Sequence, residues 1–318
     1  MPPSGELYIR YSATDHGERD IPAGTEYWLS PAIEIIGSGL GPGTARAGID
    51  QTVRVYVGNQ GANAHTDVNV QVYCTDWGTS GGWLQSLGGP AGREVGPLTV
   101  VGNAKWDTNS EGVFDVNWHP VSSELGGAMT KHVCLFANVY RPGDGAAQSN
   151  PPVFAVPTNQ HHAQRNVTLA AAIMGGNIRF VLQATNLVEE GGVFLLEVAE
   201  TPGRLDRIDA RQLAGTDWLG EAQGAVGGKL PLHKRAGDLR LEAEGQKGRR
   251  LKLELEPGKQ VPVVLGATPA RPQEPGLHRF SIVQRSARTG EIVAGARLLV
   301  AALPEKLIPR ELLEANER

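Results

Sequence analysis

The sequence has few residues of several types, and each shortage excludes a class of protein. Only 2 of the 318 residues are cysteines, too few for a disulfide-rich scaffold or for a zinc site with four cysteine ligands. No apolar run approaches the roughly 18 residues that a membrane-spanning helix needs. The 30 Lys and Arg residues do not exceed the 34 Asp and Glu residues, and the net charge is −4. We therefore expect no membrane span and no nucleic-acid partner.

The first residues, MPPSGELYIRYSATDHGERD, lack the basic segment and following apolar segment of a conventional signal peptide. This leaves three expectations for the compartment: the cytoplasm, export by an unconventional route, or a trimmed mature form outside the cell. The sequence does not choose among them.

Glycine and proline are abundant, with 41 and 21 residues, which favours many turns between short strands over long helices. Apolar side chains recur at every second position in segments such as 53–57 and 251–255, the period of a strand with one buried face. The length suits two domains of about 150 residues each. We therefore predict an all-β protein built from two tandem immunoglobulin-like β-sandwich domains.

The strand signals are interrupted near residue 160, after a proline-containing extended segment at 151–157. We predict a first domain at 1–160 with an N-terminal extension, a second domain at 161–303, and a C-terminal tail at 304–318. A helix is expected only in that tail. The glycine-rich segment 78–96 is too irregular for a strand and is expected to fold back onto the first sandwich. Seven strands are predicted for the second domain, at 178–184, 193–198, 239–243, 251–255, 261–265, 278–284 and 292–300.

One set of motifs in the first half is typical of a known kind of module. A Val-x-Val-x-Val strand at 53–57 is followed by Asn59-Gln60-Gly61 and by a second alternating strand at 68–74. This order resembles bacterial cell-adhesion-related modules of the CARDB type, which are Ig-like sandwiches. The segments Tyr8-Ile9-Arg10 and Ala163-Gln164-Arg165-Asn166-Val167 are similar to those of a set of bacterial two-domain proteins. The resemblance implies a binding or structural module.

Candidate chemical sites are few, and we expect no cofactor and no metal. In the loop 37–43, Pro42 stands where a dinucleotide-binding loop needs its third glycine, which favours a connecting loop. His161 and His162 are adjacent, so on a strand they point to opposite faces and cannot both bind one ion. We interpret them as polar residues of the interdomain bridge and as candidate partner or glycan contacts. Asp206 and Asp209 are expected on loops.

Cysteines and tryptophans carry the remaining site hypotheses. Cys74 and Cys134 lie in two strong strands of one domain, where they form a disulfide or pack as small buried apolar residues. Five of the six tryptophans lie in the first domain. If exposed, Trp77 and Trp83 offer a surface for stacking on a sugar or contacting a partner; the alternative is packing in the core.

These observations favour a non-catalytic structural or interaction protein that acts through macromolecular contacts, including self-assembly. Edge strands are natural templates for strand addition, and the segments 1–12, 151–157 and 304–318 are the expected contact elements. The alternative is a carbohydrate-binding or adhesion module of a bacterial surface or secreted system. A third hypothesis, a peptidase or esterase with a dispersed site, has no supporting motif.

Overall fold

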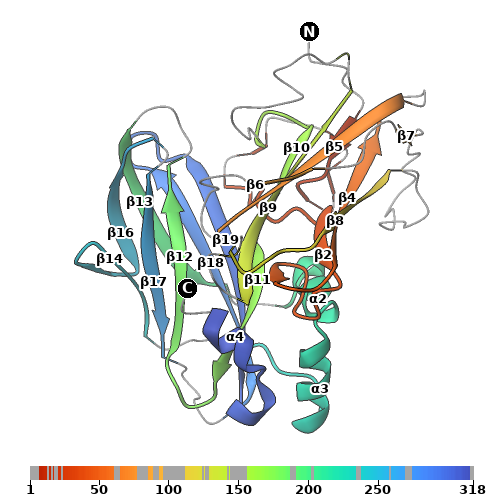
Figure 1. Ribbon diagram of the computed structural model, residues 1–318. Coiled ribbons are helices and arrows are strands. Elements are labelled where there is room, and N and C mark those ends of the chain that lie inside the picture. The colour runs from red at the N-terminus through yellow and green to blue at the C-terminus, as the bar shows by residue number, and fades with distance from the viewer. Residues whose placement is uncertain are drawn as a thin grey trace.

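The computed structural model describes residues 7–315, apart from positions 13, 16, 18–20, 23, 61–64, 77–84, 89–92, 96–111, 124, 126–128, 142, 144–155, 187–190, 202–203, 234–237, 258 and 269–273. Most of the described chain forms strands, and these build two sandwiches that lie side by side (Figure 1). The predicted fold class is confirmed: the protein is mostly β, and its sheets pair into Ig-like sandwich domains.

The strands of the first sandwich are β1 (Leu7–Ile9), β2 (Ile33–Ile36), β3 (Thr44–Arg46), β4 (Gln51–Asn59), β5 (His65–Asp76), β6 (Gln85–Gly88), β7 (Arg93–Val95), β8 (Val113–Trp118), β9 (Thr130–Tyr140) and β10 (His162–Arg165). In one sheet, β4 pairs with β1, β2 and β8. In the facing sheet, β9 pairs with β5, β10 and β3, and β5 pairs with β6 and β7. The expectation that 78–96 contains no strand is wrong, because β6 and β7 both bond to β5.

The strands of the second sandwich are β11 (Val167–Ile173), β12 (Ile178–Thr185), β13 (Gly192–Glu200), β14 (Leu239–Ala243), β15 (Gln246–Gly248), β16 (Arg250–Leu255), β17 (Gln260–Ala267), β18 (Gly276–Ser286) and β19 (Ile292–Leu303). One sheet has the order β11-β19-β18-β13-β16, in which β11 runs parallel to β19. The other has the order β12-β17-β14-β15. All seven strands predicted for this domain are present.

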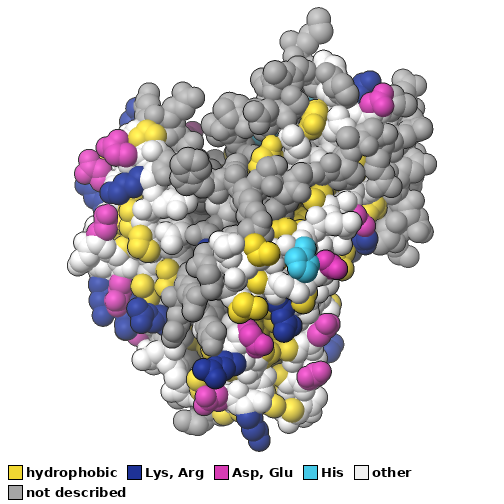
Figure 2. All heavy atoms as spheres, viewed as in Figure 1, with side chains coloured by type: hydrophobic (Ala, Val, Ile, Leu, Met, Phe, Trp, Pro, Cys, Tyr) yellow, Lys and Arg dark blue, Asp and Glu magenta, His cyan; other side chains and the backbone are white. Residues whose placement is uncertain are grey.

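Alternating burial explains why these segments form sandwich strands. In β16, Leu251, Leu253 and Leu255 are buried, whereas the three charged residues between and before them are exposed. In the facing sheet, exposed charges of both signs also pair, as Lys247 of β15 does with Glu242 of β14 at 3.0 Å. Figure 2 shows such mixed charges over the visible side of the second sandwich. The outward faces are therefore solvated, and the inward faces form the cores.

Each sandwich has its own apolar core. Strands β4, β5, β8 and β9 line the core of the first, and β12, β13, β16, β17, β18 and β19 line the core of the second. Asn166 separates the last strand of the first sandwich, β10, from the first strand of the second, β11. The chain thus passes directly from one sheet into the next without an intervening linker.

The helices are α2 (Arg207–Ala214), α3 (Asp217–Ala225) and α4 (Arg310–Ala315), preceded by the 3-10 turn η2 (Glu305–Leu307). The expectation of a helix only in the tail is wrong, since α2 and α3 lie in the connection between β13 and β14. Trp218 and Leu219 of α3 and Leu312 of α4 pack on Leu299 and Ala301 of β19, on the face turned away from the sandwich core. In the described part of the chain, no helix has the length and apolar character needed to cross a bilayer.

Candidate functional site

The interdomain junction centres on helix α2, which the local sequence defines at both ends. Asp206 is the N-cap: its side chain accepts from the Asp209 amide at 2.9 Å, and the Asp209 side chain accepts from the Asp206 amide at 3.0 Å. Such a reciprocal capping box satisfies amides that have no partner within the helix. At the other end, the Gly215 amide donates to Arg211. Asp206 and Asp209, expected on loops, therefore begin a helix.

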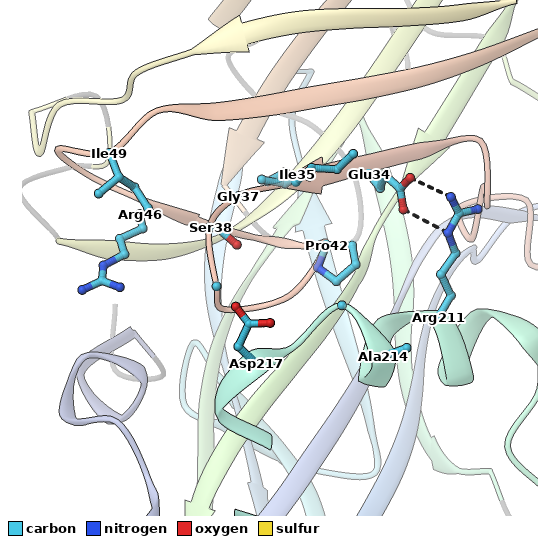
Figure 3. Close-up of a pocket in the computed structure, with 13 residues that line it drawn as sticks. Glu34, Ile35, Gly37, Ser38, Pro42, Arg46, Ile49, Arg211, Ala214 and Asp217 are labelled. Atoms are coloured by element: carbon cyan, nitrogen blue, oxygen red, sulfur yellow. Dashed lines mark hydrogen bonds and ion pairs between the residues drawn. The ribbon is translucent and has the colours of Figure 1, made fainter. Parts of the chain in front are cut away.

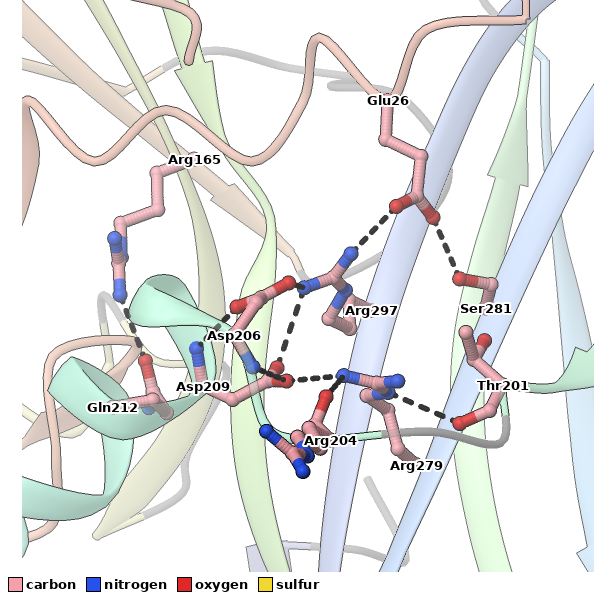
Figure 4. A network of polar contacts seen from close by, with 10 residues as sticks. All are labelled: Glu26, Arg165, Thr201, Arg204, Asp206, Asp209, Gln212, Arg279, Ser281 and Arg297. Carbon is pink, nitrogen blue, oxygen red and sulfur yellow. Dashed lines mark hydrogen bonds and ion pairs between the residues drawn. The ribbon is translucent and has the colours of Figure 1, made fainter. Parts of the chain in front are cut away.

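The carboxylates of this first turn bind arginines of the second sandwich (Figure 4). Asp209 is fully buried and accepts from Arg279 of β18, and Arg297 of β19 lies 3.3 Å from its other oxygen. Arg297 also binds Asp206 and Glu26, each at 2.5 Å. Glu26 comes from the first sandwich, so this network of charges joins both domains.

Burial and pairing act against each other in this network. Burial disfavours the charge on Asp206, but the Asp209 amide and the Arg297 guanidinium outweigh it and lower the pKa of Asp206. Burial likewise disfavours the charge of Arg297, yet Glu26, Asp206 and Asp209 together raise its pKa. The groups are therefore held charged at neutral pH, where each stabilises the other.

The opposite side of α2 binds the first sandwich. Arg211 donates to both oxygens of Glu34, at 2.9 and 2.6 Å, and to the Pro31 carbonyl at 3.0 Å. The Tyr56 hydroxyl donates to Glu34 at 2.9 Å. One short helix thus carries ion pairs to both sandwiches, and its removal would break both sets of contacts.

Arg165, the last residue of β10, lies between α2 and the first sandwich. Its guanidinium donates to the Ser30 carbonyl at 3.0 Å and to the Gln212 side chain at 2.9 Å. The residue is 1% exposed, and this burial lowers the pKa of Arg165 to about 10. It therefore stays charged at neutral pH, with hydrogen bonds to both the first sandwich and α2.

An aromatic contact closes the junction on another side. Trp28 of the first sandwich is fully buried, and its indole packs on the backbone of Gly295 in β19, where an added Cβ would collide with the ring. The neighbouring Tyr27 hydroxyl donates to the Val293 carbonyl at 2.6 Å. Glycine at position 295 is thus required by the close approach of the indole, and not by a turn.

The glycine-rich loop that follows β2 is also a packing element. An added Cβ at Gly43 would collide with the Val167 carbonyl of the second sandwich, and one at Gly41 would lie 2.6 Å from the Thr216 hydroxyl. Gly41 also has a φ of +105°, which favours glycine. The loop is therefore seated against the second sandwich and against the turn between α2 and α3.

A pocket of about 550 Å³ opens where this loop faces the turn between the helices (Figure 3). Its walls include Ile36, Pro42 and Ile49 from the first sandwich and Ala214 and Asp217 from the helices. Glu34 and Arg211 border it as an ion pair. The pocket therefore lies between the first sandwich and the helices that the second domain inserts between β13 and β14.

Cys74 and Cys134 are both buried and are not joined by a disulfide, which corrects the disulfide hypothesis and agrees with the alternative of small buried residues. Cys74 pairs with Leu135 and Cys134 with Thr75 in the adjacent strands β5 and β9. Because successive residues of a strand point to opposite faces, the two thiols point away from each other. Burial raises the pKa of the Cys134 thiol to about 12, so this thiol stays protonated at neutral pH.

His161 and His162, the candidate partner contacts, are both buried within the chain. His162 belongs to β10, opposite Asn138 of β9, and the His161 amide donates to the Asn159 side chain at 2.9 Å. Both are therefore held inside the first sandwich, in or directly before β10, and are not exposed to a partner. Trp77 and Trp83 lie outside the described residues, as does the part of segment 151–157 up to residue 155.

Sequence reasoning missed the junction residues Glu26, Glu34, Arg211, Arg279 and Arg297. A local signal existed for α2, since Asp206 and Asp209 stand three residues apart, ahead of Gly215. The arginines had no such signal, because their partners lie far away in sequence.

Comparison with known proteins finds only distant similarity. No family model matches the chain, and no curated protein matches it. Among solved structures, the N-terminal domain of PorA matches at 11% identity and a TM-score of 0.26, covering 43% of this chain and 87% of that one. PapD-like domain 7 of human CEP192 matches at 8% identity and 0.25, covering 44% and 82%. The enterotoxigenic Escherichia coli adhesin CfaE matches at 11% identity and 0.24, covering 95% and 93%. These similarities assign the chain to no family.

Proposed function

We propose that this protein is a non-catalytic structural or interaction protein that presents its two sandwiches as one rigid body to other macromolecules, including further copies of itself. The observation that carries the proposal is the charge network of α2, in which buried carboxylates and arginines join both domains. The finer proposal is that the first sandwich is a CARDB-type adhesion-related module, supported by the Val-x-Val-x-Val motif of β4.

Rigidity is what this network supplies. Domains of one chain move relative to each other by default unless their interface is large and well packed. Separating these sandwiches would expose the Trp28 indole. It would also part Arg297 from Glu26 and Arg211 from Glu34, which leaves partly buried charges without their partners. A fixed angle between the domains suits a protein whose role is to hold contact surfaces at a set distance.

Strand β12 is the proposed contact edge for self-association, because it ends its sheet. The end strand β16 of the facing sheet is closed in part by Gln246 of β15. The Gln246 side chain binds both the amide and the carbonyl of Lys252, at 3.1 and 2.7 Å. An edge closed in this way is a poor template for strand addition, which favours β12.

The test is light scattering of the purified chain over a wide concentration range, combined with negative-stain microscopy. We expect mass to rise with concentration in the wild type and in Val181→Thr, and to fall back to the monomer in Val181→Pro, which lacks an amide in the middle of β12. Circular dichroism checks that the proline variant is folded. Monomers at every concentration, with no binding to any macromolecule recovered alongside the protein, would contradict the proposal.

A second candidate function is glycan binding by the first domain, on the observation that Trp77 and Trp83 stand in or beside a glycine-rich segment. Exposed aromatic rings stack on sugars through their faces. The test is a glycan array with wild type, Trp83→Ala and the core variant Trp118→Phe as a control. Binding lost only in Trp83→Ala favours this function, and a blank array excludes it.

A further inference from the structure

The pocket at the junction has one charged side chain whose charge is not balanced by a neighbour. Glu34 and Arg211 form an ion pair, and the Tyr56 hydroxyl donates a further hydrogen bond to Glu34. Arg46 lies 3.9 Å from Glu311 of α4, and Figure 3 shows its guanidinium turned toward that helix. Asp217 makes no ion pair within the described residues. It is exposed, and its carboxylate points up toward the glycine-rich loop (Figure 3).

The position of Asp217 directs its carboxylate into the pocket. It begins α3, and a Cβ added to Gly39 of the facing loop would lie 3.7 Å from its Oδ2. The carboxylate therefore lies next to the loop at ordinary contact distance. It is exposed, so a cation that enters the pocket can reach it.

Apolar side chains line the approach to that carboxylate. Ile36 is 38% exposed, an unusual exposure for a large aliphatic residue in this chain, and it lies in the pocket wall with Ile49, Pro42 and Ala214. An apolar wall that ends at a carboxylate is complementary to a lysine or arginine side chain, whose methylenes pack on apolar surface while the charged end finds an anion.

An anionic occupant fits less well. The Arg211 guanidinium already donates to Glu34, Pro31 and Tyr56, so its fork has little capacity left for a phosphate or carboxylate. The Ser38 hydroxyl donates to the Gly41 carbonyl and accepts from the Leu40 amide. Among the described charged groups of the pocket wall, Arg46 has its partner Glu311 at 3.9 Å and is turned away toward α4 (Figure 3), which leaves the Asp217 carboxylate as the charge that faces the loop.

From this geometry we propose that the pocket receives a lysine or arginine side chain of a partner protein, with Asp217 binding its charged end. The inference rests on the proposed interaction function and names the chemistry of one contact. The pocket forms only when the junction is assembled, so we expect the partner to bind the two-domain unit and not either sandwich alone.

The experiment is an NMR titration of the full chain with N-acetyl-arginine amide and N-acetyl-lysine amide, and with N-acetyl-glutamate amide as the acidic counterpart. We expect saturable shifts of amides in 36–49 and 214–217 with the basic probes. Asp217→Asn is expected to weaken binding about tenfold, and added salt to weaken it further. Ala214→Trp, which fills the pocket and keeps the charge, is expected to abolish it. Glu221→Gln, an exposed change on the same helix, is the matched control and is expected to bind as the wild type does.

Equal or tighter binding of the acidic probe, unchanged affinity in Asp217→Asn, or the absence of saturable shifts up to about 50 mM probe would each overturn the inference. Light scattering separates this failure from that of the proposed function. If the chain associates but does not bind the basic probes, only the pocket assignment is wrong. If the chain binds the probes but never associates with any macromolecule, the proposed function is wrong.

Discussion

The cores of the two sandwiches and the junction between them are built on different principles. Each core consists of apolar side chains from alternating strands, as Leu251, Leu253 and Leu255 illustrate. The junction buries ion pairs, a glycine under an indole and a capped helix, and its strongest contacts are polar. Apolar cores tolerate exchanges of similar volume, whereas a buried charge depends on its one partner. We therefore expect substitutions at the junction to lower the free energy of unfolding more than substitutions of similar size in the cores.

The largest effect is expected at Asp209. Asp209→Asn leaves the buried guanidinium of Arg279 without its anion, and we expect the free energy of unfolding to fall by about 3–5 kcal/mol in urea titrations. The control is Asp115→Asn, which breaks the exposed ion pair with Arg54 and is expected to cost about 0–1 kcal/mol. Equal losses in the two variants would remove the distinction between junction and surface.

A pH effect is expected at His278 of β18, next to His233. Burial, and then the neighbouring His233, lower the pKa of His278 to about 4. The unfolded chain takes up this proton near pH 6.5 and the folded chain only near 4, so stability falls as the pH drops through this window. The contribution is on the order of 2–3 kcal/mol.

The measurement is the free energy of unfolding between pH 8 and 4 for the wild type and for His278→Phe. The variant keeps an aromatic ring stacked beside Phe280 but cannot titrate. Its stability is expected to depend less on pH across the window. Parallel curves for the two proteins would show that His278 does not carry this dependence.

Gly295→Ala tests the aromatic contact of the junction. The added methyl group collides with the Trp28 indole, and overpacking of this kind costs about 1–3 kcal/mol. Thermal unfolding measures the loss. If alanine is tolerated without change in midpoint, Trp28 does not fix the approach of the two sandwiches.

The smallest effect, with the opposite sign, is expected at Gly220 in α3. Apart from its chain neighbours and the backbone of its own helix, no heavy atom lies within 4 Å of an added Cβ there, and alanine is the better helix former. Gly220→Ala is expected to stabilise the protein by about 0.5–1 kcal/mol. If both Gly295→Ala and Gly220→Ala lose stability, the loss in Gly295→Ala cannot be assigned to the close approach of the Trp28 indole.

The sequence predicts the cores well because strand alternation is a local property. Alternation in 251–255 and in 53–57 identifies β16 and β4, with their buried faces. A further local signal went unused: 294–303 is apolar almost throughout, which indicates a strand covered on both faces. The layer formed by α3 and α4 on β19 accounts for that pattern.

The junction was beyond such reasoning because its partners are remote in sequence. Arg211 and Glu34 are 177 residues apart, and Arg279 and Asp209 are 70 apart. Neither arginine stands in a pattern that distinguishes it from a solvated surface residue. The helix α2 could be predicted from its capping residues, but its contacts with both sandwiches depend on the assembled fold.

Differential scanning calorimetry tests most directly whether the junction makes the two sandwiches a single cooperative unit. The account predicts one transition for the wild type, with equal calorimetric and van't Hoff enthalpies, and two separate transitions for Glu34→Gln, which removes the partner of Arg211 across the junction. Two independent transitions in the wild type, unchanged by that substitution, would contradict it.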